Sequence, residues 1–363
     1  MSRKLYSTEV EKQKAFLVSI AVNKEFDPEE SLIELKALAE AGDLDVVGSL
    51  FQSTNQPSVQ FLIGTGKLEE LKLEVERAKP DVIIFDCELS GMRIRNLEAE
   101  LKCKVIDRTM LILDIFACRA ISSEGKLQVQ LAQLKYSMPR LVGLTSSNNK
   151  YGGGVGMRGP GETKLELDKR RINEQLIRVE NKLKELEKNK ELTRMNRKNN
   201  KVKTVALVGY TNSGKSTLLN TLTKANVLSK DMLFATLDTT SRNIWFEQGK
   251  QAVITDTVGF VSRLPHDLVN AFKSTLKETI DAHLLVIVVD ISSKRAIKEL
   301  DIVFDVLKEL KASSKPTIIA LNKIDKGKIA NNIKDKYPHV VEISAKNNIG
   351  IDVLRQEIVK LLF

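Results

Sequence analysis

Residues 209–216, GYTNSGKS, constrain the fold of this chain more than any other stretch. They match the pattern G-x-x-x-x-G-K-[ST], and they lie between a β-branched apolar run, KTVALVG, and a helix-forming run, TLLNTLTKA. In such a strand–loop–helix unit, the backbone N–H groups of the loop and of the helix N-terminus hold phosphate oxygens. The spacing therefore predicts a phosphate-binding loop, in which Lys215 reaches the β- and γ-phosphates and the Ser216 hydroxyl ligates Mg²⁺.

Three short motifs follow this loop in chain order, and each stands at the end of a predicted strand. Asp256–Gly259, in VITDTVGF, offers an aspartate for the Mg²⁺ shell and a glycine whose N–H can meet the γ-phosphate. Asn322–Asp325, in TIIALNKIDK, ends on a carboxylate that can accept the N1–H and 2-amino donors of guanine, which adenine lacks. Ser344–Lys346, in VEISAKN, can bring backbone N–H groups to the guanine O6. Four motifs in this order predict a GTP-binding domain.

The N-terminal part of the chain alternates short β-branched runs with helical patterns. Strands are predicted at 15–22, 43–51, 81–86 and 104–107, and helices at 29–41, 67–78 and 92–101. This alternation requires crossover connections, so it predicts an α/β domain with a largely parallel sheet. The GTGK turn at Gly64–Lys67 lacks the spacing of a phosphate loop. An ordinary turn before a helix is its favoured interpretation, and a second phosphate site is the alternative.

Two runs share one spacing of apolar residues. In residues 127–141, and again in residues 172–186, apolar side chains recur at i, i+4, i+7, i+11 and i+14. Each run predicts a helix with a narrow apolar stripe of coiled-coil type. Residues 143–163 between them are rich in Gly, Ser and Asn, which favours a helical hairpin with this loop at its far end. The predicted domains are then 1–122 for the α/β domain, 123–200 for the hairpin with a basic linker, and 201–363 for the domain with the phosphate loop.

Charge and cysteine content limit the function classes. The chain of 363 residues has a formal net charge of +10, and residues 158–203 hold 15 Lys and Arg against 8 Asp and Glu, a net charge of +7. Such a segment is typical of a surface that meets a nucleic-acid backbone or an anionic membrane, and a solvated helix face is the alternative. Cys87, Cys103 and Cys118 form neither a zinc spacing nor a disulfide framework, and no run has the length of a signal peptide core or a membrane span. We expect a cytoplasmic protein, with peripheral membrane association left open.

Four stretches outside these motifs carry a family resemblance. They are VIDRTMLILDIF at 105–116, EGKLQVQLAQLKY at 124–136, RGPGETKLELDKRR at 158–171 and FATLDTTSR at 234–242. Together they closely resemble the HflX family of ribosome-associated GTPases, from residue 15 to the C-terminus. The resemblance implies an N-terminal α/β domain with a parallel sheet, a long antiparallel helical hairpin, and a C-terminal Ras-like P-loop GTPase domain. It also implies hydrolysis of GTP to GDP and phosphate with Mg²⁺.

The resemblance assigns nucleotide contacts residue by residue. The implied contacts are Gly209, Tyr210, Thr211, Asn212, Ser213, Gly214, Lys215, Ser216, Phe234, Ala235, Thr236, Leu237, Asp238, Asp256, Thr257, Val258, Gly259, Asn322, Lys323, Ile324, Asp325, Ser344, Ala345 and Lys346. Thr236 corresponds to the switch threonine that ligates Mg²⁺ together with Ser216. The residues by themselves leave Thr239 and Thr240 as competing candidates. Catalysis would then rest on Lys215, Thr236 and Gly259.

Position 260 departs from a pattern found in many GTPases. Many of them place a glutamine directly after the D-x-x-G glycine to orient the attacking water, but this chain has Phe260 there. A phenylalanine side chain cannot hydrogen-bond water, so we expect slow hydrolysis in isolation and faster hydrolysis on a partner that completes the site. His266, in RLPHDL, is a candidate replacement base, although an exposed histidine without a chemical role is the favoured interpretation.

The resemblance implies the large (50S) ribosomal subunit and its 23S rRNA as the partner, met by the N-terminal domain and the hairpin tip around Arg158–Arg171. On that tip, Lys150, Tyr151 and Arg158 could reach phosphates or stack on unpaired bases. Splitting or rescue of stalled or idle ribosomes is the leading hypothesis. The alternatives are a ribosome-assembly GTPase, a nucleotide switch with little hydrolysis and a membrane-peripheral regulator. We expect a monomer, and we do not expect the contacts of the further C-terminal domain that many family members carry, since the sequence ends at Phe363.

Overall fold

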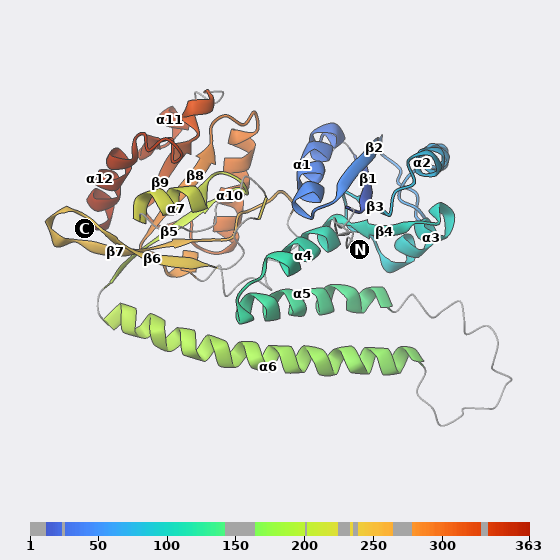
Figure 1. The fold of residues 1–363 in the computed structure, drawn as a ribbon, viewed down its shortest axis with the longest axis horizontal. Coiled ribbons are helices and arrows are strands. Elements are labelled where there is room, and N and C mark those ends of the chain that lie inside the picture. The colour runs from blue at the N-terminus through green and yellow to red at the C-terminus, as the bar shows by residue number, and fades with distance from the viewer. Residues whose placement is uncertain are drawn as a thin grey trace, which may run out of the picture. The chain divides into compact units, whose positions relative to one another are not determined.

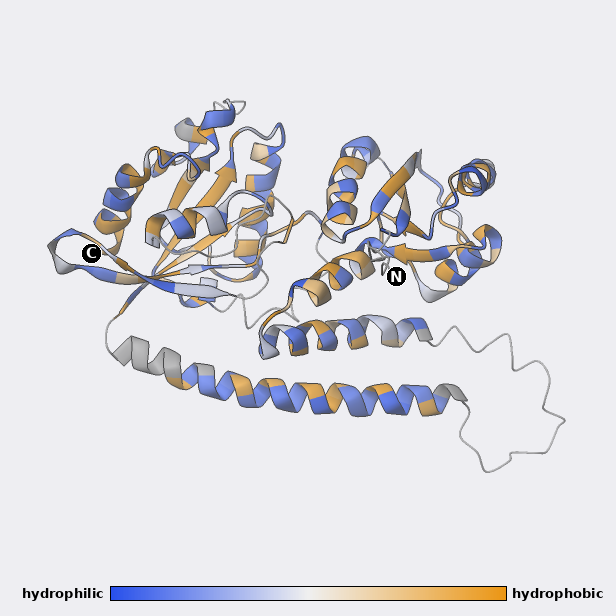
Figure 2. Cartoon of the chain, in the orientation of Figure 1, coloured by the Kyte–Doolittle hydropathy of each residue, from blue (hydrophilic) through white to orange (hydrophobic). Residues whose placement is uncertain are grey.

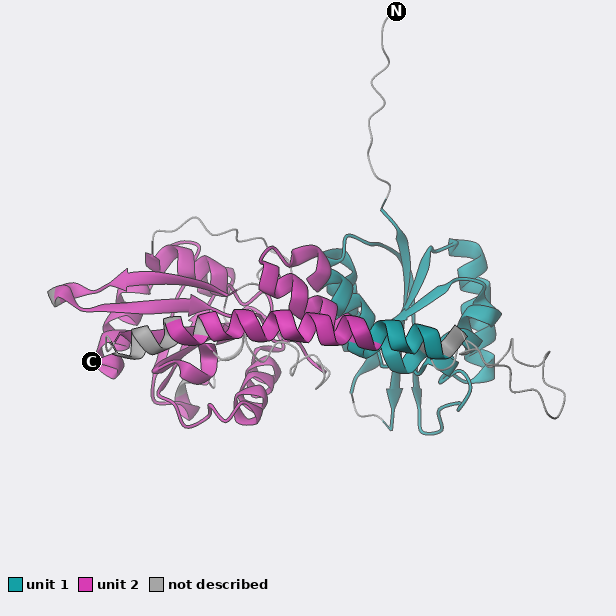
Figure 3. Ribbon diagram, turned by 90° about the horizontal axis from the view of Figure 1, so that it is seen from below, with its two compact units in different colours: residues 1–115, 135–172 teal, residues 116–134, 173–363 magenta. Residues whose placement is uncertain are grey.

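The computed structural model describes residues 12–23, 26–141, 164–199, 202–223, 233–234, 239–263, 278–327 and 333–363. The chain forms two compact units, residues 1–115 with 135–172 and residues 116–134 with 173–363 (Figure 3). The division passes through both helices of the hairpin, and the domain boundaries drawn from the sequence stay a prediction. None of the helices in the described ranges is long and apolar enough to cross a membrane.

The first unit contains a four-stranded parallel sheet, as the alternation of strands and helices predicts (Figure 1). Its strands pair in the order β2-β1-β3-β4, and helices connect them along the chain. The strands are β1 (Lys14–Val22), β2 (Asp45–Thr54), β3 (Val82–Phe85) and β4 (Lys104–Asp107), and the helices are α1 (Pro28–Ala41), α2 (Thr65–Ala78) and α3 (Gly91–Leu101). The predicted elements of this domain are confirmed, and their ends differ by no more than three residues.

Local chemistry explains where these helices begin. The Asp27 carboxylate accepts the backbone N–H of Glu29 at 3.0 Å and caps α1, and Pro28 fills the first helical position, where its missing N–H costs nothing. Helix α2 begins directly after Gly64, and Lys67 donates to Glu70 at 2.9 Å one turn later. The turn Gly64–Lys67 is therefore the start of a surface helix.

The hairpin consists of α5 (Ser123–Leu141) and α6 (Lys164–Asn199), which run in opposite directions as predicted (Figure 1). A helix that the sequence patterns did not single out, α4 (Arg108–Arg119), joins β4 to this hairpin. Helix α6 is hydrophilic over most of its surface, with apolar residues at intervals (Figure 2). On the predicted stripes, Leu131 and Val179 are buried. The tip loop at 143–163, with Lys150, Tyr151 and Arg158, lies outside the described residues.

A buried polar network joins the carboxyl ends of β3 and β4 to α5. Asp107, the last residue of β4, accepts hydrogen bonds from the Tyr136 hydroxyl at 2.5 Å and from Arg140 Nη2 at 2.9 Å. The neighbouring Arg108 donates to the Asp86 carboxylate at 2.7 Å. Burial, and to a smaller extent the Asp107 carboxylate, raises the pKa of Tyr136. The hydroxyl therefore stays protonated and can donate its hydrogen bond. The stretches at 105–116 and 124–136 that carry the family resemblance thus meet in one network.

The second unit contains a six-stranded sheet in the order β10-β9-β8-β5-β7-β6 (Figure 1). Among the strand pairs of the described residues, the edge pair β6–β7 is the antiparallel one. The strands are β5 (Lys203–Gly209), β6 (Thr240–Trp245), β7 (Gln251–Asp256), β8 (Leu284–Asp290), β9 (Thr317–Asn322) and β10 (Val340–Glu342), and the helices include α7 (Lys215–Thr223), α10 (Ala296–Glu309), α11 (Ile333–Lys336) and α12 (Ile351–Leu362). This is the P-loop α/β architecture that the sequence predicts.

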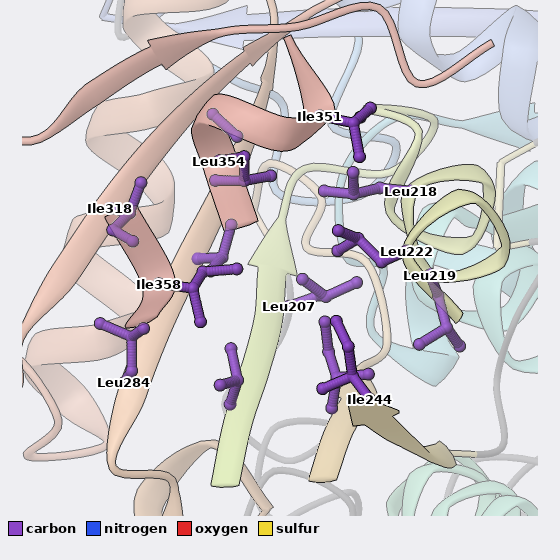
Figure 4. Packing of buried hydrophobic residues seen from close by; sticks show 14 of the residues in the cluster. Leu207, Leu218, Leu219, Leu222, Ile244, Leu284, Ile318, Ile351, Leu354 and Ile358 are labelled. Atoms are coloured by element: carbon purple, nitrogen blue, oxygen red, sulfur yellow. The ribbon is translucent and has the colours of Figure 1, made fainter. Parts of the chain in front are cut away.

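Alternating side chains of β8 divide the core of this unit between the two faces of the sheet. Leu284, Val286 and Val288 belong to a cluster with residues of α7 and α12 (Figure 4). Leu285, Ile287 and Val289 belong to a second cluster, with residues of α10. Successive side chains of a strand point to opposite faces, so an unbroken apolar run is what a strand covered on both sides needs.

The carboxyl ends of the parallel strands carry the motifs found in the sequence. β5 ends at Gly209, β7 at Asp256 and β9 at Asn322, and the motif Ser344–Lys346 begins two residues after the end of β10. In open sheets of this kind, ligands bind outside the carboxyl ends of the strands. The topology therefore brings the motifs to one edge of the sheet.

Candidate functional site

The phosphate loop is folded so tightly that two of its positions have no room for a side chain. A Cβ on Gly209 would lie 2.4 Å from the Val288 carbonyl oxygen, and a Cβ on Gly214 would lie 2.3 Å from Asn322 Nδ2. Gly214 also has φ +96°, a conformation that residues with a side chain rarely adopt. Helix α7 starts directly afterwards, so its first N–H groups face the loop.

Lys215, the first residue of α7, is buried in this loop. Its ammonium donates to the carbonyl oxygens of Gly209 at 3.2 Å and Tyr210 at 2.8 Å. Burial lowers the pKa of Lys215 to about 8, although the Asp256 carboxylate opposes the shift and the Lys323 ammonium adds to it. An anion bound beside Nζ would raise the pKa of this lysine again.

Hard oxygen atoms suited to Mg²⁺ converge next to the lysine. The Ser216 hydroxyl donates to Asp256 Oδ2 at 2.6 Å, which joins the start of α7 to the end of β7. Asp256 is fully buried, and the next residue, Thr257, donates to the Leu207 carbonyl oxygen at 2.7 Å. One hydroxyl and one carboxylate fit a cation that takes its other ligands from water and phosphate, as Mg²⁺ does.

Asn322 connects the phosphate loop to the loops that follow β9 and β10. Its Nδ2 donates to the Ser213 carbonyl oxygen at 2.8 Å, and its Oδ1 accepts the backbone N–H of Ala345 at 3.0 Å. The next residue, Lys323, donates to the Asn212 carbonyl oxygen at 2.8 Å. Three segments far apart in the sequence are therefore held together by side chains of one motif.

The predicted guanine-binding carboxylate, Asp325, stands at the surface beside this junction. The buried Ser344 hydroxyl donates to Asp325 Oδ1 at 2.5 Å and accepts the backbone N–H of Asn347 at 3.2 Å. The bond from Ser344, above all, holds the pKa of Asp325 below its ordinary value. The carboxylate therefore stays ionised at neutral pH, with one oxygen fixed by Ser344. Ile324 follows Lys323 in a short 3₁₀ turn, and Lys346 is exposed.

The structure describes part of the segment 234–240, which contains the candidate threonine ligands of Mg²⁺. Phe234 is buried, and its ring meets the Phe116 ring edge to face at a centroid distance of 4.6 Å. Ala235, Thr236, Leu237 and Asp238 lie outside the described residues. Thr240 begins β6, opposite Asp256 on β7. The choice among Thr236, Thr239 and Thr240 as the Mg²⁺ ligand therefore stays open.

Phe260 has a role that the sequence did not reveal. Its side chain is buried in the apolar cluster that β8 shares with α10. Its backbone N–H donates to Gly209 at 3.1 Å, and its carbonyl oxygen accepts the Thr211 N–H at 2.7 Å. Phe260 thus anchors the D-x-x-G segment to the phosphate loop and to the core. His266, the candidate replacement base, lies outside the described residues.

Two contacts of the site escaped the motif search. The Tyr210 hydroxyl accepts the backbone N–H of Ser262 at 2.7 Å, which adds a third bond between the phosphate loop and the D-x-x-G segment. Lys323 also pairs with Asp290, the last residue of β8, at 2.8 Å. The position of Asp290 at a strand end was the available signal.

Comparisons with known proteins agree with this geometry. Three family models match along the chain: "GTP-binding GTPase N-terminal" at residues 29–117, "GTP-binding GTPase Middle Region" at 119–197 and "50S ribosome-binding GTPase" at 204–323. The GTPase HflX of Caldanaerobacter subterraneus is 50% identical over 355 residues, which cover 97% of this chain and 81% of that protein. The GTPase HflX of Escherichia coli is 41% identical over 355 residues, which cover 96% and 83%.

A solved structure shares the fold. It is that of a GTP-binding protein from the hyperthermophilic archaeon Sulfolobus solfataricus in complex with GDP, with 26% sequence identity and a TM-score of 0.50 over 96% of this chain and 98% of that chain. The motifs at the sheet edge, the matched models and the identity to relatives over nearly the whole chain lead to one conclusion: this chain belongs to the HflX family of GTPases and is a GTP hydrolase.

Proposed function

We propose that this GTPase binds the large ribosomal subunit and uses its GTP cycle to split or rescue stalled or idle ribosomes. The observation that carries the proposal is the match of residues 204–323, which contain the phosphate loop and the D-x-x-G motif, to the model described as a 50S ribosome-binding GTPase. A ribosomal partner would also account for the concentration of positive charge between residues 158 and 203. A protein that acts on ribosomes is expected in the cytoplasm, and we propose that this protein acts there as a monomer.

In the proposed nucleotide site, residues 209–216 wrap the phosphates of GTP. Lys215 would leave the carbonyl oxygens of Gly209 and Tyr210 for the β- and γ-phosphates, and the charge of the nucleotide would hold it protonated. Ser216 would ligate Mg²⁺ together with Thr236, and Asp256 would hold the shell of the ion. The Mg²⁺ ion would neutralise charge that develops between the β- and γ-phosphates.

Guanine recognition would fall to the junction around Asn322. Asp325, oriented by Ser344, would accept the N1–H and 2-amino donors of the base with its ionised carboxylate. The segment Ser344–Lys346 would offer backbone N–H groups to O6, while Asn322 keeps this segment beside the phosphate loop. We infer that guanine specificity depends on this junction as much as on Asp325 itself.

The rRNA contact is proposed for the N-terminal domain, the hairpin tip and the adjoining start of α6. On α6, Arg170 and Arg171 are exposed, and the Arg171–Asp168 pair at 3.9 Å is too long and too open to water to neutralise the arginine. Such side chains can reach RNA phosphates at little desolvation cost.

Sedimentation of 70S ribosomes tests the proposal. The protein is added with GTP, GDP or a non-hydrolysable GTP analogue, and the 70S, 50S and 30S peaks are compared on sucrose gradients. We expect loss of the 70S peak and comigration of the protein with 50S in the GTP and analogue samples. Binding to isolated 50S without loss of 70S would favour the assembly role, and no binding to any particle would refute a ribosomal function.

A further inference from the structure

Thr211, in the phosphate loop, has a buried hydroxyl without a partner. The residue is 6% exposed, and among the described residues no group hydrogen-bonds its Oγ1. Its backbone N–H is already engaged, because it donates to the Phe260 carbonyl oxygen at 2.7 Å. A buried hydroxyl left without a hydrogen bond destabilises a folded protein, and a partner that arrives with the ligand would account for such a hydroxyl in a binding loop.

The surroundings of Thr211 place it beside the groups expected to face the γ-phosphate. A Cβ built on Gly259 would lie 2.9 Å from Thr211 Cα, 2.9 Å from Thr211 Cγ2 and 2.9 Å from Lys215 Nζ. The Thr211 side chain and the lysine ammonium therefore converge on the glycine of the D-x-x-G motif. A rotation of about 120° about χ1 moves Oγ1 into the position that Cγ2 occupies and Cγ2 into the position of the hydrogen on Cβ, so the hydroxyl can reach the space in front of Gly259 without any backbone movement.

The position that supplies the water-orienting side chain in many GTPases cannot do so here. Phe260 has no polar side-chain atom, and its ring is buried in the core on the α10 side of the sheet. Another buried hydroxyl of the loop, that of Ser213, lies under Gly209, 3.0 Å from the point where a Cβ of that glycine would be. Of these two residues with buried hydroxyls, Thr211 is the one that supplies two of the three atoms nearest to a Cβ on Gly259.

We propose that Thr211 is a catalytic residue whose hydroxyl hydrogen-bonds the water that attacks the γ-phosphate of GTP. The hydroxyl accepts a hydrogen bond from this water and donates its own hydrogen to a γ-phosphate oxygen, which orients the water for in-line attack. The water oxygen bonds to the γ-phosphorus, the bond to the β–γ bridging oxygen breaks with its electron pair on GDP, and the water proton ends on the released phosphate. The proposal rests on the nucleotide site described under the proposed function.

Two substitutions at one position separate the hydroxyl from the shape of the side chain. Thr211→Val keeps the branched shape and removes the hydroxyl, while Thr211→Ser keeps the hydroxyl and removes the methyl group. Thr223→Val serves as a matched control, because the hydrogen bond that the described residues give the Thr223 hydroxyl lies within α7, to the Leu219 carbonyl oxygen at 2.7 Å. Single-turnover GTP hydrolysis is measured for each full-length variant, alone and with 50S subunits.

We expect Thr211→Val to hydrolyse GTP on the order of tenfold more slowly, or worse, with affinities for GDP and for a non-hydrolysable GTP analogue close to those of the wild type. Thr211→Ser should keep most of the wild-type rate, and Thr223→Val should match the wild type. Binding of GDP with aluminium fluoride, which mimics the transition state, should weaken in Thr211→Val while GDP binding does not.

Several outcomes would overturn the inference. Equal hydrolysis by Thr211→Val and the wild type would exclude a catalytic hydroxyl, and parallel losses of rate and of analogue affinity would show a ground-state contact or a distorted loop. Both results leave the nucleotide site intact as a proposal. A wild-type protein that neither binds GTP nor hydrolyses it with 50S would instead refute the site on which the inference rests.

Discussion

Replacing Asn322 with alanine should weaken the nucleotide domain in a way that the structure allows us to size. The side chain forms two buried, long-range hydrogen bonds, one to the Ser213 carbonyl oxygen at 2.8 Å and one from the Ala345 N–H at 3.0 Å. Asn322→Ala removes the side-chain amide that forms both bonds. The Ser213 carbonyl and the Ala345 N–H are then left without it in a space too closed for full hydration. Each group stranded in this way costs about 1–3 kcal/mol.

The space that the amide of Asn322 vacates can hold a water molecule that hydrogen-bonds the two backbone groups, which keeps the sum near the lower end, so we expect a loss of about 2–4 kcal/mol of unfolding free energy. For a domain of this size, that corresponds to a fall of the melting temperature by about 5–10 °C. The phosphate loop and the Ser344–Lys346 segment also lose their link, so GDP affinity should fall together with stability. Asn322→Asp should be harmful as well, because a carboxylate can accept from Ala345 but faces the Ser213 carbonyl oxygen as a second acceptor.

Differential scanning calorimetry of the full chain, with and without saturating GDP, measures both effects. The chain contains two compact units, so the transition that GDP shifts in the wild type identifies the nucleotide domain. Asn347→Ala is a suitable control, because it changes an exposed asparagine in the same loop and leaves the backbone bond to Ser344 in place. A melting temperature and GDP affinity of Asn322→Ala equal to those of this control would refute the bridging role.

The other predictions concern charge. Asp325→Asn should shift the preference from guanine toward xanthine nucleotides, because the Ser344 hydroxyl would stay hydrogen-bonded to the amide oxygen and the NH₂ group would then face the base. Displacement of fluorescent GDP by GDP and by XDP measures the two affinities. A ratio of these affinities equal to that of the wild type would count against this orientation. Lys215→Ala should abolish GTP binding, and the wild type should take up a proton as it binds GDP near pH 8. The reason is that the buried lysine has a pKa of about 8 before binding and a higher pKa beside phosphate. Calorimetry in buffers of different ionisation enthalpy measures the proton uptake. An absence of proton uptake at this pH would contradict a buried, partly neutral lysine. Replacing Lys169, Arg170 and Arg171 with glutamine should weaken 50S binding. The slope of the logarithm of the binding constant against the logarithm of the salt concentration, measured by cosedimentation, should become less steep by about 2. An unchanged slope would exclude these residues from the RNA contact.

Periodicity and motif spacing predicted the described architecture because they report backbone geometry directly. The run Leu284–Asp290 is apolar at each position up to the last, and β8 is covered on both faces by helices. A strand that ends in a polar motif must present that motif at the carboxyl edge of a parallel sheet, so the order of the motifs was enough to bring them together.

Side-chain direction beyond the strand ends could not be read in the same way. Phe260 follows Gly259 in an irregular segment, and its inward direction is set by a backbone pairing with Gly209 and Thr211 that no sequence period encodes. The bridge made by Asn322 spans more than a hundred residues to Ser213 and is likewise invisible to local patterns. Helix α4 was missed because it follows β4 without an intervening turn, so the apolar run had no boundary that marks a new element.

Burial of Phe260 also bears on the entropy of GTP binding. A segment that becomes ordered only around the γ-phosphate loses about 1–2 kcal/mol of backbone conformational entropy per residue at the moment of binding. Here the core and the two hydrogen bonds to the phosphate loop restrain the chain next to Gly259 already in the folded protein. The ordering cost of this part of the segment is met during folding, so it does not subtract from the affinity for GTP.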